Sequence, residues 1–164
     1  MELMVLPKGS SYVVQDKKDR MLYSIKKKGF GMRYTLLDAS GYDLYSLLQT
    51  DESRKPIFKI ILNDDTFMEM RCITLFLNPT MECEGSGMKF TLKSKDMINF
   101  DIIKNGNNVG SILLKSTITE DLSFDIIIEN VDFDDYIPLF AVAIEKTFGD
   151  ISKELIKSKA APQA

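Results

Sequence analysis

Histidine and tryptophan are absent from this 164-residue sequence, and cysteine occurs only twice. Without histidine, the chain cannot form a Ser-His-Asp triad, a Cys-His pair or a His-containing metal site. Two cysteines are too few for a disulfide framework. No hydrophobic run approaches the ~20 residues that a membrane-spanning helix needs, and the N-terminal M-E-L-M-V-L-P-K lacks the features of a secretory signal. We therefore expect a cytoplasmic protein with free thiols, which can still associate peripherally with a membrane.

Neither cysteine is a good candidate nucleophile. Cys72 lies in the apolar stretch M-R-C-I-T-L-F-L, which predicts a small buried residue with an inert thiol. Cys83 lies between Glu82 and Glu84, and we expect these carboxylates to raise the pKa of its thiol. The glycines of E-G-S-G-M lack the G-K-[ST] sequence of a phosphate loop. We expect no catalytic residue, no metal and no cofactor, so the sequence does not predict an enzyme.

Positive charge is concentrated in the first third of the chain. Residues 1–60 hold eleven Lys and Arg against seven Asp and Glu, whereas the whole chain has a net charge of −3. Most of the excess lies between Lys17 and Arg33. Such a cluster suits an anionic surface. The alternative is that the lysines form the solvated rim of β-hairpins, where they discourage edge-to-edge aggregation.

Alternating apolar and polar residues predict short antiparallel strands along most of the chain. Clear examples are 21–25, 88–93 and 122–129, because successive side chains of a strand point to opposite faces of a sheet. Turn sequences separate these runs, namely D-K-K-D, D-A-S-G, N-D-D and N-G-N-N. The turn and outgoing strand at 16–25 recur at 38–47, and this weak repeat indicates a meander of hairpins.

One helix stands out near the C-terminus. From Tyr136 to Ile144, the run Y-I-P-L-F-A-V-A-I has no polar stripe, and a helix that is apolar on every face must be buried on every face. Pro138 suits a first turn and Gly149 suits a stop, so we expect the helix at about 134–148. A closed antiparallel barrel with this helix through its centre buries it and also leaves no exposed sheet edge. The tail, 158–164, has no apolar face and we expect it to be disordered.

Three aspartates precede the predicted helix: Asp132, Asp134 and Asp135. Acidic side chains stabilise the positive end of a helix dipole, and any of the three can cap the helix. Their close spacing also suits a hard cation such as calcium, although the D-x-[DN]-x-[DN]-G loop is absent.

Two stretches resemble the LURP-one-related proteins. M-R-Y-T-L-L-D-A-S-G-Y-D-L-Y-S-L (32–47) is similar to that family's N-terminal hairpins, and V-D-F-D-D-Y-I-P-L-F-A-V-A-I-E-K-T-F-G-D (131–150) is similar to its closing helix. The family belongs to the tubby C-terminal-like superfamily, with phospholipid scramblases as relatives. This resemblance implies one domain over residues 1–157, mostly β, built as a closed barrel of about twelve strands around a central buried C-terminal helix.

Tubby-type domains bind phosphoinositides through surface Lys and Arg, and the sequence contains no histidine and no convergent catalytic motif, so we expect a non-catalytic binding module. Here the candidate residues for an anionic lipid headgroup are Lys26, Lys27, Lys28 and Arg33, on the hairpin K-K-K-G-F-G-M-R. Phe30 within it inserts at a lipid interface, stacks on a base or turns inward in a tight hairpin. The alternative function is a scaffold for a protein partner. We expect an anionic membrane lipid or a protein as partner, and no nucleic acid.

Overall fold

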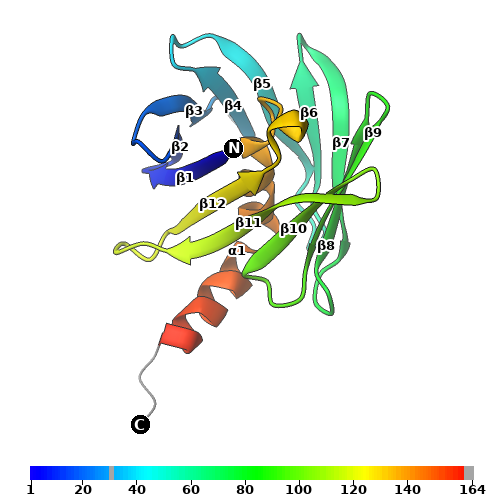
Figure 1. Cartoon of the computed structure of the whole chain (residues 1–164). Helices are drawn as coiled ribbons and strands as arrows, with labels where there is room; N and C mark the ends of the chain where they lie inside the picture. Colours follow the sequence, from blue (N-terminus) through cyan, green and yellow to red (C-terminus); the bar gives the residue numbers. More distant parts are fainter. Residues whose placement is uncertain (30–31, 161–164) are drawn as a thin grey trace.

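In the computed structural model, which describes residues 1–29 and 32–160, twelve strands are followed by a short 3-10 helix and one α-helix (Figure 1). The strands are β1 (Glu2–Lys8), β2 (Ser11–Gln15), β3 (Met21–Lys27), β4 (Arg33–Asp38), β5 (Asp43–Asp51), β6 (Ile57–Leu62), β7 (Asp65–Thr74), β8 (Thr80–Gly85), β9 (Met88–Ser94), β10 (Asn99–Lys104), β11 (Asn107–Ser116) and β12 (Leu122–Ile128). The helices are η1 (Asn130–Asp132) and α1 (Pro138–Ala160).

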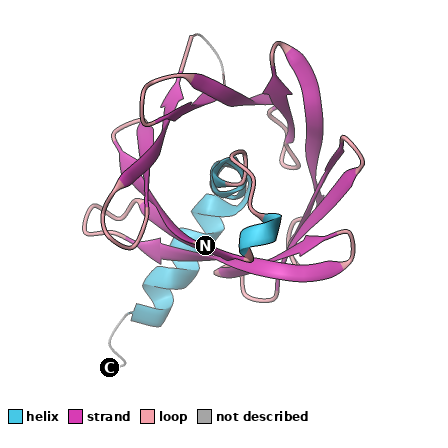
Figure 2. Ribbon diagram, turned by 45° about the horizontal axis from the view of Figure 1, so that its top comes forward, coloured by secondary structure: helices cyan, strands magenta, loops and turns pink. Residues whose placement is uncertain are grey.

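The strands form a closed antiparallel barrel, as predicted. Each strand pairs with its neighbours in sequence, and β1 pairs with β12 to close the ring (Figure 2). At this seam Leu3 lies opposite Ile126 and Val5 lies opposite Phe124, and all four side chains are buried. The closing pair is therefore held by core packing as well as by backbone hydrogen bonds, and the sheet has no free edge.

The period-two pattern corresponds to the inner and outer faces of the barrel. On β12, Phe124, Ile126 and Ile128 are buried, whereas Ile127 between them is half exposed. The predicted turns also form: Asn63, Asp64 and Asn105 adopt positive φ in hairpin connections. Polar turn residues therefore reverse the chain, and alternating apolar residues fill the interior.

Helix α1 runs through the centre of the ring (Figure 2). Every residue from Tyr136 to Ile144 is buried. Phe140 lies 5.1 Å from Phe90 between ring centroids, and Tyr136 lies 6.1 Å from the same ring of β9. The prediction of a central buried helix is confirmed, and its aromatic side chains pack directly on the barrel wall.

The predicted helix boundaries are wrong at both ends. The helix begins at Pro138, because residues 135–137 form a turn, and it continues past 148 to Ala160. Gly149 does not stop the helix but is buried within it, where a Cβ would come within 3.2 Å of Glu145 Cγ. Beyond it, the buried Ser152 hydroxyl donates a hydrogen bond of 2.6 Å to the Met97 carbonyl. Residues 158–160 of the predicted disordered tail are therefore helical, and 161–164 lie outside the described residues.

The aspartates before the helix have partners other than its backbone amides. Asp132 pairs with Lys104 at 3.6 Å, Asp134 accepts a 3.1 Å hydrogen bond from Tyr136, and Asp135 accepts one of 2.5 Å from Tyr23. Among the described residues, no backbone amide of the helix donates a hydrogen bond to any of these carboxylates. The predicted side-chain cap is thus not formed, because Asp132 and Asp135 connect the chain before α1 to barrel strands and Asp134 accepts from Tyr136 within that segment.

At the opposite end of the barrel, Tyr12 of β2 donates a hydrogen bond to the Glu145 carboxylate of α1. The C-terminal part of α1 extends out of the barrel at its lower end in the view of Figure 1. Within 1–29 and 32–160, the structure contains no helix with the length and hydropathy required to cross a bilayer.

Candidate functional site

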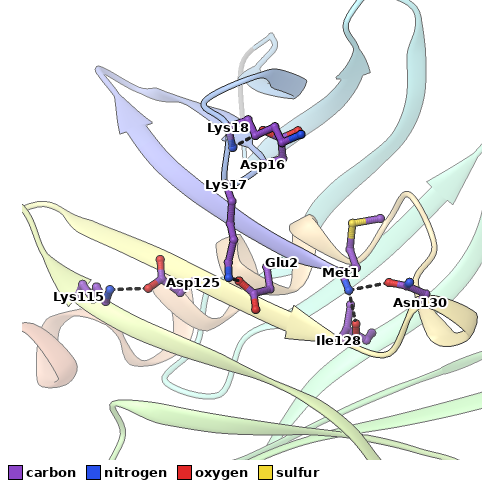
Figure 3. Close-up of polar contacts among 9 residues, drawn as sticks. All are labelled: Met1, Glu2, Asp16, Lys17, Lys18, Lys115, Asp125, Ile128 and Asn130. Carbon is purple, nitrogen blue, oxygen red and sulfur yellow. Dashed lines mark hydrogen bonds and ion pairs between the residues drawn. The ribbon is translucent and has the colours of Figure 1, made fainter.

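Ion pairs with acidic side chains neutralise part of the excess positive charge between Lys17 and Arg33. Lys17 pairs with Glu2 of β1, and Figure 3 shows its side chain reaching across to that carboxylate. Arg20 pairs with Asp16 at 2.7 Å. In the same region Lys115 pairs with Asp125 (Figure 3). These exposed pairs contribute little to stability, but they leave less cationic charge free for a ligand.

Lys28, one of the four predicted binding residues, also has an acidic partner. Its ammonium lies 3.2 Å from a carboxylate oxygen of Asp43, at the start of β5. The other three, Lys26, Lys27 and Arg33, have no ion pair among the residues that the structure describes. Free positive charge on the hairpin is therefore centred on these three residues.

The barrel separates the free cations onto two faces. Lys27 lies opposite Tyr34, whose ring is in the core, so Lys27 lies on the inner face at the rim of the barrel. Lys26 lies opposite Thr35, one residue along, and is therefore on the outer face. Arg33 precedes Tyr34 on β4, so it also lies on the outer face, and its carbonyl accepts a 3.1 Å hydrogen bond from the Lys28 amide. The four predicted residues do not form one cluster.

Lys26 lines a hollow on the outer face together with a second lysine that the sequence pattern did not indicate. We call this the β1–β3 hollow. Its volume is about 340 Å³ and it is lined by Lys8, Ser11, Tyr12, Val13, Met21, Ser24 and Lys26. On β1 and β2, Lys8 lies opposite Ser11. On β2 and β3, Tyr12 lies opposite Ile25. The same register, moved by one residue, places Ser11 beside Lys26. Neighbouring strands thus bring Lys8 and Lys26 to two sides of Ser11.

The β1–β3 hollow offers hydrogen-bond donors and positive charge without a carboxylate in its lining. Lys8 and Lys26 are exposed, and neither ammonium has an ion pair within the described part of the chain. The backbones of Lys8 and Lys26 lie two strand spacings apart, about 10 Å. Over this distance both lysine side chains can reach the same phosphate group. The half-buried Ser11 adds a hydroxyl group between them, and the half-buried Ser24 adds a second one beside Lys26 on β3.

The glycine-flanked aromatic of the hairpin lies mostly outside the described residues. Gly29 adopts φ +75°, with open space where a Cβ would lie, which agrees with a tight turn. Phe30 and Gly31 are not among the described residues, so the orientation predicted for Phe30 stays a prediction.

The two thiols are structural. Cys72 and Cys83 are free and buried. Burial raises the pKa of both, and for Cys83 it is the sole cause. The predicted role of Glu82 and Glu84 is wrong, because strand neighbours of a buried residue point to the opposite face. No cluster of three potential metal ligands occurs in residues 1–29 and 32–160.

The fold defines the class of protein: a closed antiparallel β-barrel threaded by one helix. Residues 2–144 match the model of the LURP-one-related family, so the chain belongs to that family. Among curated proteins, no sequence matches this chain. A solved X-ray structure of a protein from Arabidopsis thaliana is similar with a TM-score of 0.42 and 15% identity, over 92% of this chain and 90% of that chain.

Proposed function

We propose that this protein is a non-catalytic binding module that recognises anionic lipid headgroups at the β1–β3 hollow. The observation that carries the proposal is the position of Lys8 and Lys26 on opposite sides of Ser11, with Ser24 beside Lys26 on β3, in a recess whose lining has no carboxylate. A phosphate group accepts hydrogen bonds from ammonium and hydroxyl donors alike, and it neutralises two lysines at once.

The shape of the site favours a headgroup at a surface over an enclosed small molecule. The hollow lies across three strands on the outer wall of the barrel and is open to solvent through its exposed lysines. Arg33, on the same face two strands from β2, adds charge beside it. Each basic residue near an anionic leaflet contributes ~1 kcal/mol, and the attraction is screened within about 8 Å at physiological salt. Recruitment would be weak, reversible and dependent on ionic strength, at the cytoplasmic surface of a membrane.

Catalysis is not part of this proposal. The sequence has no histidine, and both thiols are buried with a raised pKa. The groups that surround the hollow are lysine ammoniums and serine hydroxyls, which bind an anion without an adjacent general base to activate a nucleophile.

Co-sedimentation with phosphatidylcholine vesicles that contain phosphatidylserine tests the proposal. The test variant is Lys8→Glu/Lys26→Glu. The matched control is Lys93→Glu/Lys95→Glu, which changes the net charge equally at two exposed lysines of β9 and its following turn. Circular dichroism establishes that both variants are folded.

We expect wild type and control to sediment at low salt and to be released at high salt, with the hollow variant at least tenfold weaker. Equal loss in both variants would mean that binding depends on net charge and not on the hollow. No sedimentation by the wild type would contradict lipid recognition and favour the alternative, a protein-interaction scaffold.

A further inference from the structure

A second concave surface, with no lining residue in common with the β1–β3 hollow, lies at the end of the barrel from which α1 emerges. Two adjoining cavities share Arg54, Leu75 and Phe76. One, of about 400 Å³, lies against α1, and the other, of about 530 Å³, follows the connection between β7 and β8. We call the two together the helix-exit cleft. Each lies within the size range of small-molecule sites.

The apolar part of the cleft is formed by a run of exposed hydrophobic side chains. Ile73, Phe76 and Leu77 are 39%, 56% and 86% exposed, and all lie within five residues of one another. The sequence M-R-C-I-T-L-F-L is typical of a continuous strand, but β7 ends at Thr74 and the last three residues leave the barrel wall. A contiguous group of large exposed apolar side chains is typical of a surface that binds a ligand, a membrane or another protein.

The polar part of the cleft has an excess of positive charge. Its cationic residues are Arg54, Lys146 and Lys153, against the carboxylates of Glu145 and Asp150. Glu145 is already hydrogen-bonded to Tyr12, and Lys146 lies 5.2 Å from the centroid of the Tyr34 ring. Lys55, at the apolar side, donates a hydrogen bond of 3.2 Å to the Ile73 carbonyl.

Arg54 occupies the boundary between the two parts. It lines both cavities, and within the described part of the chain its guanidinium has no ion pair. A guanidinium presents a planar fork of donors that matches a carboxylate or a phosphate. The charge at the boundary and the hydrocarbon surface beside it are complementary to a ligand with an anionic head and an apolar tail.

We infer that the helix-exit cleft binds a single-chain amphipathic anion, such as a fatty acid or an alkyl phosphate. Its head lies against Arg54, and its alkyl chain covers Ile73, Phe76 and Leu77. Burial of those three side chains supplies the hydrophobic part of the affinity, and the arginine selects an anion over a neutral or cationic head. This inference is independent of the proposed function, because the β1–β3 hollow and the cleft share no lining residue.

The absence of tryptophan from the sequence makes a specific reporter available. Phe76→Trp keeps an aromatic ring in the cleft and introduces a single fluorophore. The probes are decyl phosphate, decanol and decylammonium, each kept monomeric and without vesicles. Arg54→Gln in the reporter background tests the head contact, Leu77→Ser tests the tail contact, and Lys95→Gln is the control on another turn of the barrel. Both test residues are exposed, so these variants are expected to fold.

We expect a saturable blue shift with decyl phosphate, with affinity at least tenfold weaker in Arg54→Gln and several-fold weaker in Leu77→Ser. Decanol and decylammonium bind more weakly than decyl phosphate, and Lys95→Gln binds like the reporter protein. Equal binding of all three probes, or an unchanged affinity in Arg54→Gln, would overturn the inference. So would the absence of a saturable shift, including the case in which the reporter responds only to added phosphatidylserine vesicles. The Lys8→Glu/Lys26→Glu substitutions, which should abolish vesicle binding, should not change the affinity for decyl phosphate. The experiments therefore test lipid binding at the β1–β3 hollow and ligand binding at the helix-exit cleft separately.

Discussion

The phenol of Tyr12 on β2 donates a hydrogen bond to the carboxylate of Glu145 on α1, 133 residues further along the chain. At the other end of the barrel, Tyr23 of β3 makes the corresponding contact with Asp135, at 2.5 Å. One tyrosine–carboxylate pair thus joins the turn just before α1 to the barrel wall, and the other joins the barrel wall to the first half of the helix. Between the two pairs its side chains pack in an apolar interior.

Alkaline pH is expected to destabilise the protein through its tyrosines. Burial, together with a nearby carboxylate, raises the pKa of Tyr12, Tyr23 and Tyr136. In the unfolded chain a tyrosine ionises at about pH 10, whereas in the fold these phenols keep their protons to higher pH. The stability that they contribute is present below about pH 10. Above it, stability falls by about 1.4 kcal/mol per pH unit for each tyrosine that stays protonated in the fold.

Urea unfolding between pH 8 and pH 11 measures this slope, and Tyr12→Phe should make it shallower. At neutral pH the same variant should lose about 1–2 kcal/mol, because Glu145 loses its hydrogen bond. Tyr42→Phe is the control, since this side chain is 72% exposed. A slope that is the same in both variants would mean that Tyr12 is not a buried donor.

Phe140 tests the central helix. Its ring is fully buried, 5.1 Å from Phe90 and 5.9 Å from Tyr136. Phe140→Ala should cost about 3–5 kcal/mol in denaturant unfolding, and Phe140→Asp should prevent folding because it buries an unpaired charge. Leu155→Ala, on the emerging part of the helix, should cost much less. A Phe140→Asp protein with the wild-type melting temperature would show that the helix is not inside the barrel.

Gly110 tests the packing between β11 and β12. A Cβ at this position would overlap the Ile127 carbonyl oxygen and lie 2.8 Å from the Ile128 Cα. Because both are backbone atoms, Gly110→Ala must separate the two strands, at a cost of about 1–3 kcal/mol or more. Ser111→Ala, next to it, should change stability by about 0.5 kcal/mol or less. Similar unfolding midpoints for the two variants would contradict this close approach.

Ser152 tests the continuation of the helix beyond Gly149. Its buried hydroxyl donates to the Met97 carbonyl, and Ser152→Ala should cost about 1–3 kcal/mol because that acceptor stays buried without a donor. Ser158→Ala, on the exposed last turn, should be nearly neutral, and so should removal of 158–164. Equal stability of the two serine variants would favour the shorter helix that the sequence predicted.

The sequence predicted the barrel because its strongest signals are local. The alternation along β12 requires a strand with one buried face, and the absence of a polar stripe from Leu139 to Ile144 requires a helix buried on all sides. A barrel closed around the helix meets both requirements. The end of the helix could not be predicted, because Gly149 is typical of a stop. The helix continues because its later turns have tertiary contacts, among them the hydrogen bond of Ser152 to Met97, 55 residues away, and the packing of Ile151 and Ile156 against the core.

The candidate site was predicted in part. Lys26 was identified from the run of lysines, but Lys8 lies in the separate β1–β2 hairpin and comes beside Lys26 only through the register of β1, β2 and β3. The same register places Lys27 on the inner face. Charge runs in a sequence do not indicate which of their members share a face, because that depends on strand parity and on pairing between distant segments.

Titration with glycerol 3-phosphate, followed by nitrogen–proton NMR of the labelled protein, tests headgroup binding at the β1–β3 hollow most directly. This probe carries the anionic headgroup without an acyl chain, so it addresses the hollow alone. We predict saturable shifts of the Lys8, Ser11, Ser24 and Lys26 amide signals, which disappear in a Lys8→Gln/Lys26→Gln protein and persist in Lys93→Gln/Lys95→Gln. Shifts located elsewhere on the barrel, or the same shifts in both double variants, would contradict binding at this hollow.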